Sequence, residues 1–142
     1  MNVVVDASVL VKWYVTEEDS AQAEHLIDRR FELHAPELFL PEFGNILWKK
    51  CRNDDLDEET AKSAIKSVRS RDIVFHSNDG LLSAAFLGAR ETGQSVYDWM
   101  YLALSISLDC KFITADRKFF LGIRNTRFKN RFVWVAQISD LF

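Results

Sequence analysis

Residues 3–8 are Val3-Val4-Val5-Asp6-Ala7-Ser8, an all-valine run that ends at an aspartate. β-Branched residues favour strands, and an apolar run without polar alternation is typical of a parallel strand buried on both faces. Asp6 and Ser8 are residue types that commonly cap helices. The stretch therefore predicts a buried strand that leads directly into a helix.

The rest of the chain alternates between helical and strand patterns. Helical spacing of apolar residues is found in 19–31, 37–52, 57–68, 79–90 and 95–108. Strand-like runs lie at 33–36, 73–75, 111–115 and 132–135. We expect Pro36 to open the helix that follows it, and Gly93 to end another. Such alternation predicts a parallel α/β sheet, and no repeat, linker or boundary divides residues 1–142, so we expect one domain.

Composition and cysteine usage narrow the classes of protein. With 48% hydrophobic and 27% charged residues, the 142-residue chain has the composition of a folded domain. No apolar run is long enough to span a bilayer, so we expect no membrane partner. Cys51 and Cys110 lie far apart without C-x-x-C spacing, and the start of the chain lacks a signal-like segment. We therefore expect a reduced, cytoplasmic protein.

Charge is distributed unevenly along the chain. The net charge of −3 divides into −8 over residues 1–110 and +5 over residues 111–142. The basic residues of the second segment are Lys111, Arg117, Lys118, Arg124, Arg127, Lys129 and Arg131. Interleaved phenylalanines leave two interpretations open: a surface that follows a phosphate backbone and stacks on unpaired bases, or a solvated cationic edge above core aromatics.

Four acidic residues lie in apolar surroundings, unlike the other acids of the chain. They are Asp6, Glu42, Asp98 and Asp116. A buried carboxylate without a partner is costly, so such a group is usually paired, hydrogen-bonded or bound to metal. An all-oxygen donor set is what Mg²⁺ or Mn²⁺ prefers, and no His or Cys is present among the four to favour zinc.

The expected topology allows these four side chains to converge. Asp6 and Asp116 follow strands, and parallel α/β sheets bind ligands beyond the carboxyl ends of their strands. Asp98 and Glu42 lie early in their helices, where each can point at that edge. Asn45 lies three residues after Glu42 on the same helical face, where it can orient Glu42 or a bound water.

Each aspartate also has a purely structural interpretation. Asp6 can cap the helix that follows it, and Asp116 can cap a helical turn over 117–121. Asp98 can be the third-position acid of a capping box begun by Ser95. Glu42 has no such explanation, and the metal hypothesis depends on the four acids together.

Other chemistries lack their motifs. The chain has no glycine-rich phosphate loop and no nucleophile-elbow motif. His25, His34 and His76 are separated and fit no ligand spacing, so we expect partly exposed structural histidines.

Four segments, in order, resemble the motifs of the PIN-domain nucleases. Residues 3–13 resemble the opening motif, 36–48 the helix with the second acid, 95–104 the segment with the third acid and 112–120 the segment with the fourth. The size and the style of the motifs resemble the VapC toxins of toxin–antitoxin pairs. The resemblance implies a Rossmann-like, three-layer α/β/α sandwich with a mainly parallel central sheet, which cleaves single-stranded or loop RNA with Mg²⁺ or Mn²⁺.

The same resemblance implies roles for particular residues and partners. Asp6, Glu42, Asp98 and Asp116 carry over as metal ligands, with the hydroxyls of Ser8 and Thr114 near them. A homodimer and a cognate antitoxin that occupies the acidic groove are implied as well. Some relatives carry a further acid just after the fourth motif, where this chain has Arg117, Lys118 and Phe119. Whether one metal ion binds or two is therefore open.

These observations predict hydrolysis of a phosphodiester by a metal-activated water. We expect Arg117, Lys118 and Arg124 to bind the RNA backbone. A receiver or phosphatase domain is one rival, but the phosphatase needs an acid two residues after Asp6, where Ser8 stands. A catalytically inactive binding module of the same fold is the other.

Overall fold

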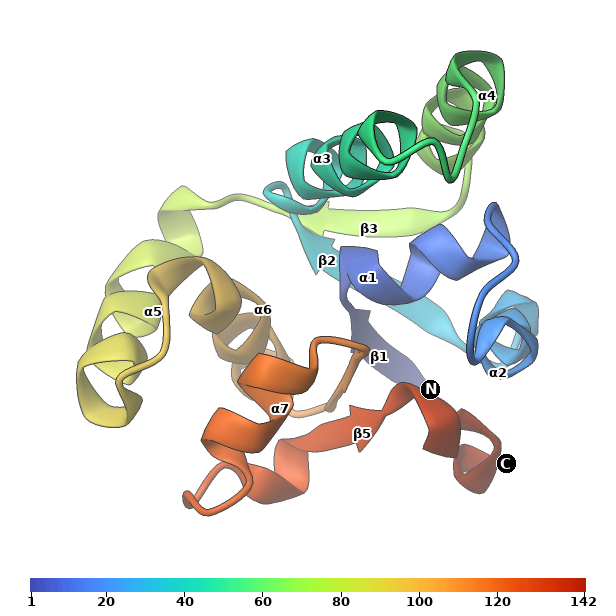
Figure 1. Cartoon of the computed structure of the whole chain (residues 1–142). Coiled ribbons are helices and arrows are strands. Elements are labelled where there is room, and N and C mark those ends of the chain that lie inside the picture. The colour runs from blue at the N-terminus through green and yellow to red at the C-terminus, as the bar shows by residue number, and fades with distance from the viewer.

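The computed structural model describes all 142 residues and contains one five-stranded sheet (Figure 1). Its strands are β1 (Asn2–Val5), β2 (Glu32–Pro36), β3 (Ile73–His76), β4 (Lys111–Thr114) and β5 (Phe132–Trp134). They lie in the order β3-β2-β1-β4-β5, and all four pairings are parallel. Strand β1 is central and its three valines, Val3, Val4 and Val5, are fully buried, which confirms the prediction made from residues 3–8.

Helices cover both faces of this sheet. They are α1 (Ala7–Leu10), α2 (Ser20–Glu24), α3 (Phe39–Arg52), α4 (Glu58–Arg69), α5 (Asp79–Thr92), α6 (Val96–Ser107) and α7 (Arg117–Ile123). Phe39 of α3 contacts Phe75, whereas Tyr101 of α6 stacks on Phe112. In the strand register Phe75 is paired with Ala35, and Ala35 points to the face of the sheet opposite Phe112. Phe75 and Phe112 therefore lie on opposite faces. The predicted three-layer α/β/α sandwich is confirmed, and 33 buried hydrophobic residues form one core cluster.

Two local predictions were wrong, and a third element begins two residues later than expected. Pro36 ends β2 instead of opening a helix; its missing N–H is tolerated because it occupies the last position of the strand. The helix expected over 19–31 is shorter, since α2 passes into a 3₁₀ turn at His25–Ile27 and Asp28 then accepts a hydrogen bond from the backbone N–H of Arg30. Helix α3 begins at Phe39, so Pro41 lies in its first turn, where a missing N–H costs little.

The packing of α5 against α6 fixes where α6 begins. A Cβ at Gly88 would overlap the ring of Trp99, so only glycine permits this close approach. The indole of Trp99 donates a hydrogen bond to Thr92 Oγ1 at 2.7 Å. Gly93 ends α5 in the left-handed conformation (φ 74°), as predicted. These contacts hold the first turn of α6, which carries Asp98.

None of the helices combines the length and the apolar character that crossing a bilayer requires. Cys51 and Cys110 are half-buried free thiols. The expectation of a single domain over residues 1–142 stays a prediction.

Candidate active site

Two hydroxyl side chains link the carboxyl ends of β1 and β4. Thr114, the buried last residue of β4, donates its Oγ1 hydrogen to Asp6 Oδ2 at 2.9 Å and accepts the backbone N–H of Asp116, also at 2.9 Å. Ser8 Oγ accepts the backbone N–H of Ala115 at 3.3 Å. Asp6 and Asp116 are thus held beside one another by the ends of neighbouring strands.

The capping interpretation of the aspartates is also correct in part. Asp6 Oδ1 accepts the N–H of Ser8 at 3.1 Å, and Asp116 Oδ1 accepts the N–H of Phe119 at 3.1 Å. At the start of α6 the cap is Ser95, whose hydroxyl accepts the N–H of Asp98. Each capping aspartate uses one carboxylate oxygen for its cap, so capping does not exclude a second role for the same side chain.

Three of the four predicted acids line one pocket of about 500 Å³. Asp6, Glu42 and Asp116 share its wall with Ser8 and Asn45. Asp98 is half-buried, like the other three acids, but does not line this pocket. The charge of Asp98 nevertheless acts on Glu42, because it contributes to the raised pKa of that carboxyl.

Burial and mutual repulsion raise the pKa values of Asp6, Glu42 and Asp98. Burial raises the pKa of Asp6 to about 7; the Ser8 N–H and the Thr114 hydroxyl oppose the rise, and the charges of Glu42 and Asp116 add to it. Burial also raises the pKa of Glu42, and the charges of Asp98 and Asp116 contribute. The pKa of Asp98 is raised by burial and then by Asp116. The four acids therefore form one electrostatic cluster, which a cation would stabilise.

Glu42 shows the strongest need for a partner. Its Oε1 atom is buried and accepts no hydrogen bond, and the same is true of the nearby hydroxyl of Tyr101. The Tyr101 hydroxyl is close enough to lower the pKa of Glu42, yet the two groups do not meet the geometry of a hydrogen bond. A buried acceptor without a partner costs about 1–3 kcal/mol. A metal ion would supply the missing partner.

The carboxylates are near one another but not yet arranged around a point. No three His, Cys, Asp or Glu side chains have the geometry that already holds a metal ion. The donor set fits Mg²⁺ or Mn²⁺ in chemistry, because it consists of carboxylate oxygens. Side-chain rotation is needed before all of them can reach one ion.

The basic segment is divided between the two ends of the sheet. Arg117 and Lys118 begin α7 at the carboxyl end, both exposed, and Lys118 lowers the pKa of Asp98. Arg124 is exposed just after α7 and does not line the acidic pocket. Lys111 and Arg131 lie at the amino end instead.

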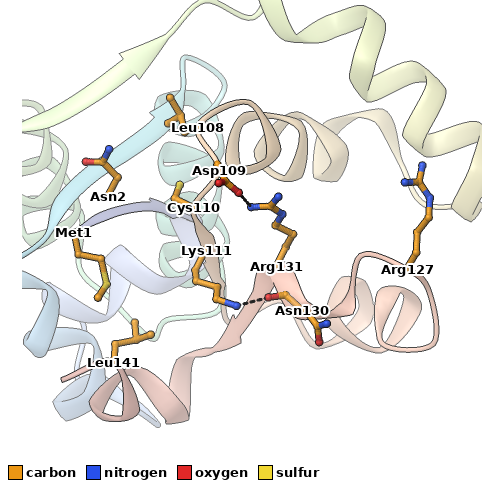
Figure 2. Close-up of a pocket in the computed structure, with 10 residues that line it drawn as sticks. All are labelled: Met1, Asn2, Leu108, Asp109, Cys110, Lys111, Arg127, Asn130, Arg131 and Leu141. Carbon is orange, nitrogen blue, oxygen red and sulfur yellow. Dashed lines mark hydrogen bonds and ion pairs between the residues drawn. The ribbon is translucent and has the colours of Figure 1, made fainter.

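A larger hollow, of about 710 Å³, lies at that amino end (Figure 2). Its cations already have partners: Arg131 pairs with Asp109 at 2.8 Å, and Lys111 donates to the carbonyl of Asn130 at 2.5 Å. Arg127, at the edge of this hollow, makes two hydrogen bonds to Glu91, each 2.9 Å long. This pocket contains none of the predicted site residues.

Sequence reasoning missed several features. Tyr97 and Lys49 line the acidic pocket, although neither was a candidate. Lys49 lies seven residues after Glu42, two helical turns along the same face, which was the available sign. His34 and His76 were expected to be separate and partly exposed, but His34 is buried and its Nδ1 lies 2.9 Å from His76 Nε2. Neighbouring strands bring the two histidines together.

The sequence matches known proteins over most of its length. The profile of the PIN domain family matches residues 3–121. Ribonuclease VapC3 from Pyrobaculum aerophilum is 37% identical over 120 residues, which is 83% of this chain and 92% of that protein.

Solved structures share the fold. PAE2754 from Pyrobaculum aerophilum has a TM-score of 0.74 at 25% identity, and the match covers 99% of this chain and 89% of that chain. VapBC2 from Rickettsia felis, solved bound to a DNA fragment from their promoter, has a TM-score of 0.61 at 11% identity, covering 94% of this chain and 98% of that chain. At 11% identity the likeness concerns the fold alone.

Proposed function

This chain belongs to the PIN domain family, and from that premise we propose that it is a metal-dependent endoribonuclease and the toxin of a toxin–antitoxin pair. The ribonuclease name of the relative that is 37% identical supports the reaction class. The observation that carries the proposal is the buried, unpartnered Oε1 of Glu42, whose carboxylate shares electrostatic repulsion with Asp98, Asp116 and Asp6.

Asp6, Glu42, Asp98 and Asp116 would hold the metal, and we propose Mg²⁺ or Mn²⁺ because every donor is an oxygen. When bound, such an ion lowers the pKa of a water and offsets charge on the phosphoryl oxygens. Thr114 fixes the carboxylate of Asp6 through its hydroxyl, and Ser8 ties the loop after β4 to α1. Asn45, exposed on the pocket wall, is placed to orient a water or Glu42.

The chain's own cations would hold the RNA. Arg117 and Lys118 are exposed beside the acidic cluster and form no ion pair, so they are free to contact phosphates. Arg124 lies further along the same segment and would extend this contact.

Cleavage of RNA by the purified chain tests the proposal. We expect Mg²⁺- or Mn²⁺-dependent cleavage that stops when EDTA is added, and loss of cleavage in Asp98→Asn. Asp98 receives a cap through its backbone N–H and does not itself cap α6, so Asn should leave the fold intact by circular dichroism. Asp54→Asn, on an exposed turn, is the matched control and should keep full activity.

Calorimetry distinguishes an active nuclease from a catalytically inactive binding module of the same fold. An active nuclease should bind Mn²⁺ in the wild type and bind it more weakly in Asp98→Asn. Full cleavage by Asp98→Asn would contradict the site assignment, and a wild type that neither binds Mn²⁺ nor cleaves RNA would contradict the function.

Partners and location form a further part of the proposal. We expect a cognate antitoxin to cover the acidic groove, a homodimer, and a cytoplasmic location; the two free cysteines agree with a reducing compartment. Leu82 and Phe86, one turn apart on α5 and 52% and 54% exposed, offer an apolar face for the second copy. Light scattering should show a dimer, and Phe86→Glu should shift it to monomer without loss of helical content.

A further inference from the structure

Two side chains on the wall of the acidic pocket form no hydrogen bond, ion pair or aromatic contact within the protein. They are Tyr97, the second residue of α6, and Lys49, near the end of α3. They come from different helices and share one pocket with Asp6, Glu42 and Asp116. A substrate phosphate that approaches the carboxylates through this pocket would therefore come close to both.

Tyr97 is a large aromatic residue that the protein leaves in solvent. Its side chain is 66% exposed, whereas Trp99 through Ser105 of the same helix are all buried. Its ring packs on no other aromatic ring or cation, and its hydroxyl makes no hydrogen bond within the protein. Trp48, another exposed aromatic residue, differs because the guanidinium of Arg52 lies over its ring, 4.8 Å from the centroid. The Tyr97 ring is therefore free to stack on a ligand.

Lys49 is an unpaired cation in the acidic pocket. It is exposed and forms no ion pair, whereas its neighbour Lys50 is bound to Glu17 at 2.7 Å. Glu42, Asn45 and Lys49 lie at intervals of three and four residues, so they share one face of α3. The face that carries the metal-binding carboxylate thus also carries a cation able to contact a phosphate.

We propose that Tyr97 stacks on an unpaired base of the nucleotide next to the cleaved bond, and that Lys49 contacts the phosphate of that nucleotide. This inference rests on the proposed ribonuclease function and assigns two residues that position the substrate. Base stacking on an aromatic ring tolerates any sequence but requires an exposed base face. In a duplex both faces are covered by neighbouring bases, so Tyr97 selects unpaired RNA.

Steady-state cleavage of an unstructured RNA and of a fully paired hairpin by the full chain provides the first test. For Tyr97→Ala we expect KM on the unstructured RNA to rise roughly 5- to 100-fold with kcat changed less than about threefold. Tyr97→Phe keeps the ring and should behave as wild type. Trp48→Ala, which removes an exposed aromatic outside the pocket, is the matched control and should change KM less than about twofold.

A spectroscopic measurement separates stacking from a structural effect. RNA that contains 2-aminopurine next to the cleavage position is bound to Asp98→Asn, which we expect to bind without cutting. Stacking on Tyr97 should change the fluorescence of 2-aminopurine, and Tyr97→Ala in the same background should remove that change. Lys49→Met should weaken binding and lower the salt slope of log K by about one, whereas Lys66→Met on α4 should do neither.

The outcomes distinguish this inference from the function on which it rests. A wild type that cleaves no RNA would overturn the proposed function. A wild type that cleaves unpaired RNA, together with a Tyr97→Ala variant of unchanged KM and unchanged 2-aminopurine signal, would overturn the inference alone. A Tyr97→Ala variant that loses binding to a partner protein but not to RNA would also overturn it.

Discussion

The two ends of the sheet differ in whether their charged side chains have partners within the protein. At the carboxyl end, four half-buried carboxylates repel one another, and a buried oxygen of Glu42 has no partner. At the amino end the larger hollow is lined by cations whose partners are supplied by the chain itself (Figure 2). This contrast indicates that polar and charged groups without a partner are a better guide to function than the size of a pocket.

The largest expected effect comes from removing one charge at the carboxyl end. Glu42→Gln should lower kcat for RNA cleavage by on the order of 1000-fold. Residues that act on one ion work as a unit, so the loss of one removes most of the activity. The thermal stability of this variant without metal should be unchanged or raised, since repulsion is relieved. The matched change at the amino end, Asp109→Asn, should leave cleavage unchanged; Asn also tolerates the left-handed conformation found there (φ 50°). An equal loss of RNA cleavage in both variants would contradict the proposed difference between the two ends of the sheet.

A second prediction concerns pH in the absence of metal. Folding raises the pKa of Asp6 from 3.8 to about 7, so the folded state favours the protonated form. The stability that this group contributes is full below about pH 4 and is lost as the pH rises through 7. At about 1.4 kcal/mol per pKa unit, the upper bound is about 4 kcal/mol. Urea unfolding in EDTA should show lower stability at pH 8 than at pH 5.

At the amino end, the pH dependence of folding stability should have the opposite sign. The bond to Arg127 lowers the pKa of Glu91, so its contribution is present above the unfolded pKa and is lost as the pH falls below it. Asp6→Asn should therefore flatten the change between pH 5 and pH 8, whereas Glu91→Gln should not. Addition of Mn²⁺ at pH 8 should restore the stability of the wild type. A wild type that is most stable at pH 8 in EDTA would contradict the crowding of the carboxylates.

The smallest expected effect is at the ion pair between Arg131 and Asp109. Asp109 is 87% exposed, and exposed pairs contribute about 0–1 kcal/mol. A double-mutant cycle with Arg131→Met and Asp109→Asn, followed by urea unfolding, should give a coupling free energy in that range. A coupling above about 2 kcal/mol would mean that the amino end depends on its charges more than the exposure suggests.

The fold could be predicted from the sequence where one local pattern decides the structure. Val3, Val4 and Val5 have no alternative to burial, and Gly93 has few alternatives to ending a helix. The end of strand β2 was harder, because Pro36 is a poor strand residue and its pairing with β3 outweighs its propensity.

The candidate site followed from topology, and its surroundings did not. The carboxyl ends of parallel strands meet at one edge, which is why Asp6 and Asp116 could be placed together from sequence. The division of the basic segment required coordinates, because residues 117–118 and 127–131 lie on either side of the turn after α7. Tyr97 resembled the other apolar residues of its helix, and only its exposure distinguishes it. The metal-binding role of the four acids stays a prediction.

Gly88 lies so close to Trp99 that a larger residue at position 88 requires a change at position 99 as well. A methyl group at residue 88 fits only if residue 99 becomes smaller, and that change removes both the bond to Thr92 and the edge contact with Phe128. Homologues with a side chain at position 88 should therefore carry a compensating residue at position 99. A lone substitution there would force Trp99 or its helix to shift, and the effect would reach the turn of α6 that carries Asp98, although residue 88 itself touches no part of the pocket.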